Sequence, residues 1–450
     1  MIQNITLLDY AILPFVLSII YFIAFRFRNR NYPPGHPYRL YFITGLTLKL
    51  AGAVFIGLVY EYYYQGGDTM NYFLHAKIIN GAFNDSPLKW FNLLLRIPDE
   101  STIGYYQYIS RMQWYQDPAS YSVAALAAFL GIFVSTTYLP TAVLFAAISF
   151  TGMWAMFRAF ARIYPNFVKP IGTAVFFIPS VVVWGSGIFK DTICLFGLGW
   201  LTYGVFRILI QRNFKLGNIL LTLLGFALVA RVKIYILLAF VPALLIWILS
   251  AYTARMSNIA GRFLIKVIVL SVAIIGSFYA MTSLGEDALG RYSLDNIEQT
   301  AQMTRDWIVY SSGDEGSAYD LGKIEGVGDM ILKFPLAVNV TLFRPYLWES
   351  RKLIILTSAL EAFLFLFLTL KVIAIVGFKK SWRTFALDPT IQFCLIFSII
   401  FAFSVGISSG NFGALSRYKI PCLPYYALMI LLIYYKNIAP DKPLFKPFGI

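Results

Sequence analysis

The sequence predicts an all-α fold, a polytopic bundle of transmembrane helices. Of its 450 residues, 59% are hydrophobic and only 13% are charged, whereas soluble domains contain about 25% charged residues. Apolar runs of about 20 residues, the length that crosses about 30 Å of hydrocarbon, recur along almost the whole chain. The alternating segments of about ten residues that are typical of outer-membrane barrels are not found in the sequence. The class of protein that these observations favour is a helical integral membrane protein.

The apolar runs predict about eleven spans of bilayer length. They lie near 7–25, 40–60, 139–160, 171–187, 192–210, 217–230, 234–252, 263–283, 352–376, 389–407 and 418–435. No basic region precedes the first run, so we expect a retained span and not a cleaved signal peptide. Residues 121–137 are also apolar, but a crossing there would invert every later segment. We therefore expect a re-entrant or obliquely buried helix on the outer side, with twelve spans as the alternative.

Clusters of basic residues predict the orientation, because cytoplasmic loops carry an excess of Lys and Arg. If residues 26–39 lie in the cytoplasm, the other clusters fall on the same side. These are Arg158/Arg162/Lys169, Arg207/Arg212/Lys215, Arg255/Arg262/Lys266, Lys371/Lys379/Lys380/Arg383 and Lys436/Lys442/Lys446. The N-terminus is then outside, and the C-terminal tail 436–450 is cytoplasmic. The net charge of +15 is explained by these loops, so membrane lipids are expected partners and nucleic acid is not.

The chain contains no evident repeat or soluble linker, so we expect one integral membrane domain over residues 1–450. Two long outer loops, about 61–120 and 284–351, hold most of its 22 acidic residues. Loops of this length are usually functional or disordered. In the first loop, "SPLKWFNLLLRIPDE" predicts a short helix that lies along the membrane interface.

Five segments bring charged side chains to the outer face in this topology. They are "YEYYYQGGDTMNYF" with Asp68 and Tyr72, "PSVVVWGSGIFKD" with Lys190 and Asp191, "ARVKIY" with Arg231 and Lys233, "FRPYLWES" with Arg344 and Glu349, and "GNFGALSRYK" with Arg417. Basic residues at outer helix ends are disfavoured, and those that are present indicate binding of an anionic ligand. Arg and Lys hold phosphate groups, and a neighbouring carboxylate can act as general base towards a hydroxyl.

Each of these residues also has a structural interpretation. The cations near residue 231 can snorkel to lipid headgroups, and Arg344–Glu349 and Lys190–Asp191 can be surface salt bridges. Asp68 can be a helix N-cap, and the tyrosines can be interface anchors. Lys49, in the middle of a span, either pairs inside the bundle or faces a polar cavity. The two histidines, His36 and His75, are isolated, so neither a zinc site nor a catalytic triad is predicted.

Several of these motifs resemble those of a known class of membrane enzymes. The acid of "GGDTMNYF" resembles the first-outer-loop acid of integral-membrane glycosyltransferases of the C-type fold. The "RPYLWE" element and the "GNFGALSRYK" ending, together with "PSVVVWGSGIFKD", resemble bacterial exopolysaccharide-synthesis and O-antigen-polymerase-like membrane proteins. The resemblance consists of scattered short motifs over roughly residues 40–435.

This resemblance implies a glycosyltransferase or polymerase that takes a sugar from a polyprenyl-phosphate carrier. Transfer to a glycan acceptor would take place on the outer face of the bacterial inner membrane, in envelope polysaccharide assembly. By position, Asp68 matches the catalytic acid. The basic positions suited to the carrier phosphate are Arg231, Lys233, Arg344 and Arg417, and we expect one outward-opening pocket to collect them. Lys190, Asp191, Glu349 and Tyr72 complete the expected substrate contacts.

Two features of the chain differ from the family pattern. "GGDT" offers one acid where many relatives have a pair, so we expect no cofactor, and a divalent metal is possible but unsupported. A span at 7–25 also precedes the one that normally opens the fold. The alternative function is non-enzymatic, either a transporter of lipid-linked glycans or a subunit of a secretion or envelope complex. A transporter is expected to show repeat halves with broken helices near mid-membrane, and no duplication is evident.

The orientation is tested with an impermeant thiol reagent on intact cells. Gly313→Cys, in the second outer loop, should be labelled, and Lys380→Cys, in a cytoplasmic cluster, should be labelled only after lysis. The reverse pattern would contradict the predicted orientation.

Overall fold

The computed structural model describes residues 4–253, 319–322, 327–350 and 352–438, together with the single residues 261, 264, 265, 268, 271, 303, 306, 310 and 444. Every regular element in these ranges is a helix. Seven helices in the described ranges are long and apolar enough to cross a membrane, judged by length and composition. They are Leu7–Asn31, Arg39–Tyr63, Tyr138–Ile163, Lys190–Ile210, Leu216–Thr253, Leu353–Val376 and Pro389–Ser408. The predicted class, a multi-pass helical membrane protein, is confirmed at this level, and the number of spans stays a prediction.

The chain forms two compact units. The first comprises Met1–Val168, Phe176–Ile208 and Asn213–Ile234, and the second comprises Lys169–Val175, Leu209–Arg212 and Tyr235–Ile450. The expected span at 263–283 falls almost entirely outside the described residues, as do much of the loop 284–351 and most of the tail 436–450. The expectation of one integral membrane domain stays a prediction.

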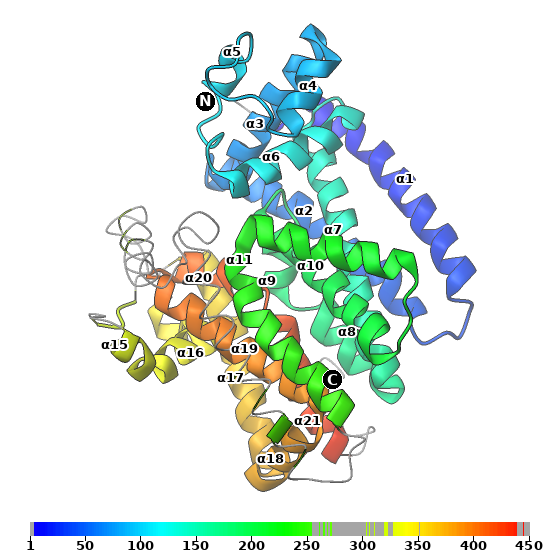
Figure 1. Ribbon diagram of the computed structural model, residues 1–450, viewed down its shortest axis with the longest axis vertical. Helices are drawn as coiled ribbons and strands as arrows, with labels where there is room; N and C mark the ends of the chain where they lie inside the picture. The colour runs from blue at the N-terminus through cyan, green and yellow to red at the C-terminus, as the bar shows by residue number, and fades with distance from the viewer. Residues whose placement is uncertain are drawn as a thin grey trace. The chain divides into compact units, whose positions relative to one another are not determined.

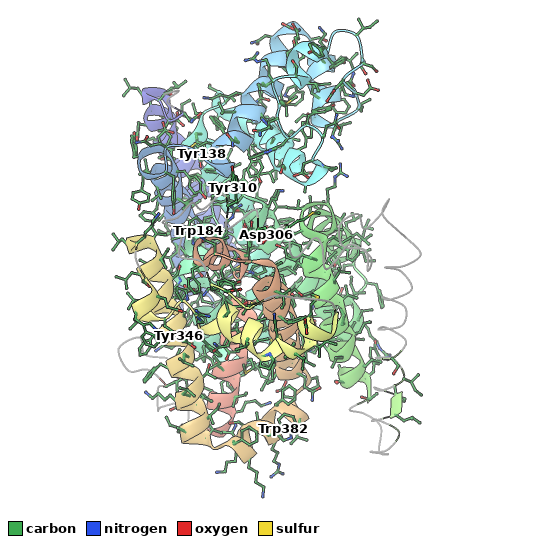
Figure 2. All side chains as sticks on the ribbon, turned by 90° about the vertical axis from the view of Figure 1, so that its left-hand side faces the viewer. Tyr138, Trp184, Asp306, Tyr310, Tyr346 and Trp382 are labelled. Carbon is green, nitrogen blue, oxygen red and sulfur yellow. The ribbon has the colours of Figure 1, made fainter. Side chains whose placement is uncertain are left out.

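The first unit is built on four long helices. They are α1 (Leu7–Asn31), α2 (Arg39–Leu58, continued by the π-helical turn Val59–Tyr63), α7 (Tyr138–Ile163) and α10 (Lys190–Val205). The predicted loop 61–120 is folded into α3 (Asp68–Asp85), α4 (Pro87–Leu94) and α5 (Tyr106–Ile109). These three gather with α6 (Pro118–Gly131) at one end of the unit (Figure 1). Tyr138, buried at the start of α7, lies among these blue and cyan helices (Figure 2) and its hydroxyl is 2.7 Å from that of Thr69.

The helix α6 corresponds to the apolar segment 121–137. Asp117 caps its start by accepting a hydrogen bond from the Ala119 backbone N–H at 3.0 Å, and Pro118 occupies the first helical position, where it needs no N–H partner. A 3₁₀ turn, Ile132–Val134, continues the helix, so the helical segment runs from Pro118 to Val134, which is still shorter than the about 20 residues that a crossing usually needs. This length favours a helix that does not cross, and its placement on the outer side stays a prediction.

Four of the expected spans differ in detail. Residues 171–187 do not form one helix, since α8 (Val168–Phe176) and α9 (Pro179–Trp184) are separated at Ile178, which has extended backbone angles. Pro179 explains the break, because a proline disfavours helical angles in the residue before it. The spans 217–230 and 234–252 together form α11 (Leu216–Thr253), in which Lys233 is the one residue with non-helical angles. The last span begins later than expected, because a turn separates α20 (Phe412–Tyr418) from α21 (Leu423–Asn437).

The second unit packs around an aromatic core. Its further described helices are α15 (Val327–Leu332), α16 (Phe334–Phe343), α17 (Leu353–Val376), α18 (Phe378–Leu387) and α19 (Pro389–Ser408). Trp247 stacks on Phe393 with ring centroids 4.8 Å apart and donates to Thr390 at 3.1 Å. The Asp388 carboxylate caps α19 and pairs with Lys436. An apolar cavity of about 360 Å³ lies between α16 and α21 and is bordered by Trp382, labelled in Figure 2.

The close packing of α10 on α7 in the first unit is tested at Gly199. A Cβ at this position would collide with the backbone carbonyl of Gly152 on α7, and such overpacking costs about 1–3 kcal/mol. We expect Gly199→Ala to lower the free energy of unfolding in detergent by that amount. The control, Gly81→Ala on α3, meets no atom within 4 Å and should be neutral or slightly stabilising. Equal stability of the two variants would contradict the close α7–α10 contact.

Candidate functional site

Asp68 lies where the chain turns from the end of α2 into α3. Gly66 and Gly67 have φ values of 148° and 114°, in the region that favours glycine. The Gly67 carbonyl accepts hydrogen bonds from the backbone N–H groups of Met70 and Asn71, so Gly67 holds the N-cap position and Asp68 is the first helical residue. The interpretation of Asp68 as the N-cap is therefore wrong, because the N-cap is the preceding residue, Gly67. Its half-buried carboxylate lies in the first turn of α3, where the helix dipole favours negative charge.

A second carboxylate and a lysine complete this end of the first unit. Lys190, the first residue of α10, pairs with Asp117 at 3.3 Å and interacts electrostatically with Asp68 and Lys233. The side chains of Lys190 and Asp117 remain 19% and 35% exposed. The structure thus brings together three elements that are distant in sequence, the starts of α3, α6 and α10. We call Asp68, Asp117 and Lys190 the charged cluster.

Asp117 was not among the residues singled out from the sequence. It accepts hydrogen bonds from the Ala119 backbone N–H and, at 2.5 Å, from the Ser120 hydroxyl. Burial acts to raise the pKa of Asp117, but the Ser120 hydrogen bond and the Lys190 charge outweigh it, and the pKa is lowered. The carboxylate is therefore ionised at neutral pH. An Asp followed by Pro is a sequence signal of a helix start, which locates this residue without revealing its contact with Lys190.

Asp191, which follows Lys190 of the charged cluster, forms a buried ion pair with Lys233. The Lys233 Nζ lies 2.5 Å from the Asp191 Oδ1, and the two side chains are 7% and 0% exposed. Lys233 is also the non-helical residue of α11. Both were predicted to contact substrate, and the structure pairs them with each other. Arg231, two residues before Lys233, is exposed.

Tyr72 and His75 share one face of α3. Both side chains are buried, and both rings contact Trp114, at 5.1 and 5.6 Å between centroids. Burial lowers the pKa of His75 to about 4, so its imidazole is neutral at physiological pH. Trp114 contacts the Tyr72 ring, which is buried, so Tyr72 does not line an open surface.

The remaining sequence-predicted residues belong to the second unit. Arg344 forms an ion pair with Glu349, whose carboxylate also accepts from the Tyr346 backbone N–H at 2.7 Å. The hydrogen bonds that Arg344 donates to the Glu349 carboxylate raise the pKa of Arg344 above its usual value. Arg417 is half-buried in the last turn of α20. The expected shared pocket draws on residues of both separately described units and stays a prediction.

Comparison with known proteins identifies no relative: no family model, curated protein or solved structure matches the chain. Within the described ranges, no group of three or more His, Cys, Asp or Glu residues is placed to hold a metal ion. The geometry of the first unit is therefore the basis for a functional proposal.

The buried ion pair is tested by removing one partner. Lys233→Met leaves the Asp191 charge buried without its lysine, and we expect a loss of about 3–5 kcal/mol in the free energy of unfolding. Asp191→Leu combined with Lys233→Met should recover much of this loss, because no unpaired charge remains. Arg231→Met, on the same helix but exposed, should change stability by no more than about 0.5 kcal/mol. Additive losses in the double variant would show that the two side chains do not form a pair.

Proposed function

We propose that the chain is a membrane glycosyltransferase that uses a polyprenyl-phosphate-linked sugar as donor. The observation that carries this proposal is the charged cluster, in which the Asp117 carboxylate pairs with the Lys190 ammonium group and the Asp68 carboxylate interacts electrostatically with the same ammonium group. Such a set can take a proton from a hydroxyl and hold a phosphate at the same place. These are the two tasks that glycosyl transfer from a phosphate carrier requires.

In the proposed reaction, Asp68 is the general base. It accepts the proton of the acceptor hydroxyl as the hydroxyl oxygen bonds to the sugar C1, and the bond between C1 and the phosphate oxygen breaks. The carrier phosphate leaves with that electron pair, and Lys190 stabilises its negative charge. Asp117 orients the Lys190 ammonium, and the buried Lys233–Asp191 pair supports the start of α10 on which Lys190 lies.

The aromatic surface beside Asp68 supports a sugar or isoprenoid substrate. Tyr62, Tyr63 and Tyr64 are 56%, 59% and 44% exposed. The first two belong to the π-helical turn Val59–Tyr63, and π-helical turns occur frequently at functional sites. Exposed rings next to a carboxylate offer stacking surfaces for a sugar ring. The same rings can contact an apolar polyprenyl chain.

This proposal extends to location and pathway. The sequence-predicted orientation places the charged cluster on the outer face of a bacterial inner membrane, where lipid-linked sugars are assembled into envelope polysaccharide. The acceptor is then a growing glycan. Arg231, Arg344 and Arg417 remain proposed contacts of the carrier phosphate.

A second candidate function, transport of lipid-linked glycans, is favoured by one observation. Helices α9 and α10 are separated by the non-helical residues 185–189, and the buried Lys49 donates a hydrogen bond to the Gly185 carbonyl at this break. Broken helices inside the membrane are typical of transporter substrate sites. Vesicles that contain the purified protein and a lipid-linked sugar separate the two functions, because an enzyme forms a new glycosidic bond and a transporter only moves its substrate.

The role of Asp68 is tested with Asp68→Asn. This change preserves the side-chain shape and removes the base, so we expect normal insertion and a loss of about 10²–10⁴-fold in the rate of glycosyl transfer. The measurement is mass spectrometry of the glycan product and of the lipid-linked donor, which should accumulate.

The matched control is Glu100→Gln, an exposed acid in the same predicted outer segment, which should retain full activity. Full glycan synthesis by a well-folded Asp68→Asn variant would refute the enzymatic proposal. Movement of the donor across vesicles without any new bond would favour the transporter.

A further inference from the structure

A second polar site lies at the opposite end of α2 from Asp68. There the connection between α1 and α2 and the last turns of α7 enclose a cavity of about 440 Å³. It is lined by Asn31, Tyr32, His36, Pro37, Tyr38, Arg158, Arg162, Pro165 and Val168, none of which is acidic. All nine residues belong to the first unit. We call this space the arginine cavity.

Two arginines one turn apart on α7 supply its charge. Arg158 packs over the Tyr203 ring of α10 at 4.5 Å, and Arg162 donates to the Tyr203 hydroxyl at 3.0 Å. The Nε of Arg158 is buried and has no hydrogen-bond partner among the described residues. Within the same residues, no carboxylate forms an ion pair with either arginine. The Tyr203 ring thus orients both guanidinium groups, and no described carboxylate neutralises their charges.

The other wall of the arginine cavity is a rigid cluster of rings. The His36 ring lies 5.1 Å from Tyr32 and 4.8 Å from Tyr38 between centroids. Trp154 donates to the Tyr32 hydroxyl at 3.0 Å, and Arg39 donates to the Tyr32 carbonyl at 2.6 Å. These bonds hold the connection in place before any ligand arrives, and preorganisation of this kind favours binding.

The rings also provide hydrogen-bond donors. The Nδ1 of His36 accepts from the Tyr38 backbone N–H at 3.1 Å, which leaves Nε2 as the ring nitrogen that can donate. Burial raises the pKa of Tyr38 although the Arg162 and Arg158 charges oppose this, so its hydroxyl stays protonated and can donate. The lining therefore combines two arginines with further hydrogen-bond donors and contains no carboxylate.

We propose that the arginine cavity binds the phosphate group of a small anionic ligand, either a phospholipid headgroup or a soluble phosphate compound. Guanidinium forks match phosphate oxygens in a bidentate manner. The volume lies within the range of about 300–1,000 Å³ that is usual for small-molecule sites, so there is room for a group attached to the phosphate. The usual excess of arginine in cytoplasmic loops is an alternative explanation for positive charge at this end of the helices. It does not explain why Arg158 is partly buried in the lining of a cavity. This inference does not depend on the proposed glycosyl transfer.

The test uses the full-length protein and two kinds of probe. Inorganic phosphate and pyrophosphate are titrated against the protein in uncharged detergent, and the protein is separately reconstituted into vesicles of phosphatidylcholine with or without phosphatidylglycerol. A ligand that binds the native state raises the midpoint of thermal unfolding, and this shift gives the apparent Kd.

The variants remove the phosphate contacts while sparing the fold. Arg162→Gln removes an exposed charge, and Arg158→Lys keeps the charge over Tyr203 but loses the bidentate fork. We expect each to weaken binding by about tenfold, the loss of one charge-assisted hydrogen bond. The matched control, Arg383→Gln on α18, is exposed, outside the cavity and on the same predicted side of the membrane, and should bind as the wild type does.

The outcomes distinguish the two ligand sources. Arginine-dependent binding of inorganic phosphate or pyrophosphate supports a soluble ligand. Stabilisation by phosphatidylglycerol alone, lost in the same two variants, supports a lipid headgroup. Binding that is equal in wild type, Arg162→Gln and Arg158→Lys would overturn the proposal, as would the absence of binding by every probe.

Discussion

The buried ion pair between Asp191 and Lys233 organises the candidate site of the first unit. It joins the start of α10 to the one non-helical position of α11. Two charges removed from water are stabilised only if each keeps its partner, so the pair restrains the start of α10 relative to α11. This restraint also positions Lys190, because Lys190 directly precedes Asp191. From there its side chain reaches Asp117 at the start of α6.

The first unit thus has polar groups at both ends of α2 and one in its middle. Asp68 follows the helix at one end, and the connection that carries His36 and Tyr38 precedes it at the other. A helix of 20 residues is about 30 Å long, the thickness of the hydrocarbon core of a bilayer. The two sites are therefore separated by about the thickness of a bilayer's hydrocarbon core. Lys49 lies between them and satisfies the Gly185 carbonyl that the α9–α10 break exposes, as a backbone group in hydrocarbon requires.

Both sites use aromatic rings to orient charge. Tyr203 supports Arg158 and Arg162 at the arginine cavity, whereas exposed tyrosines surround the turn before Asp68. Rings of this kind supply apolar surface for membrane packing and a face that attracts cations. The sequence contains 30 Tyr and 9 Trp residues, and only the folded chain shows which of them serve the lipid boundary and which hold a charged group.

The sequence by itself determined the all-helical membrane class and most helix positions, including the helix that begins at the first-loop acid Asp68. These depend on local properties, namely apolar run length and the positions of proline and glycine. The tertiary structure alone decided the partners: Asp117 for Lys190, Lys233 for Asp191, and Trp114 over Tyr72. It also showed that the helix expected at 171–187 is interrupted and that Arg158 and Arg162 line a cavity. Such contacts join residues separated by tens of positions, and no local pattern specifies them because they depend on how whole helices pack against one another.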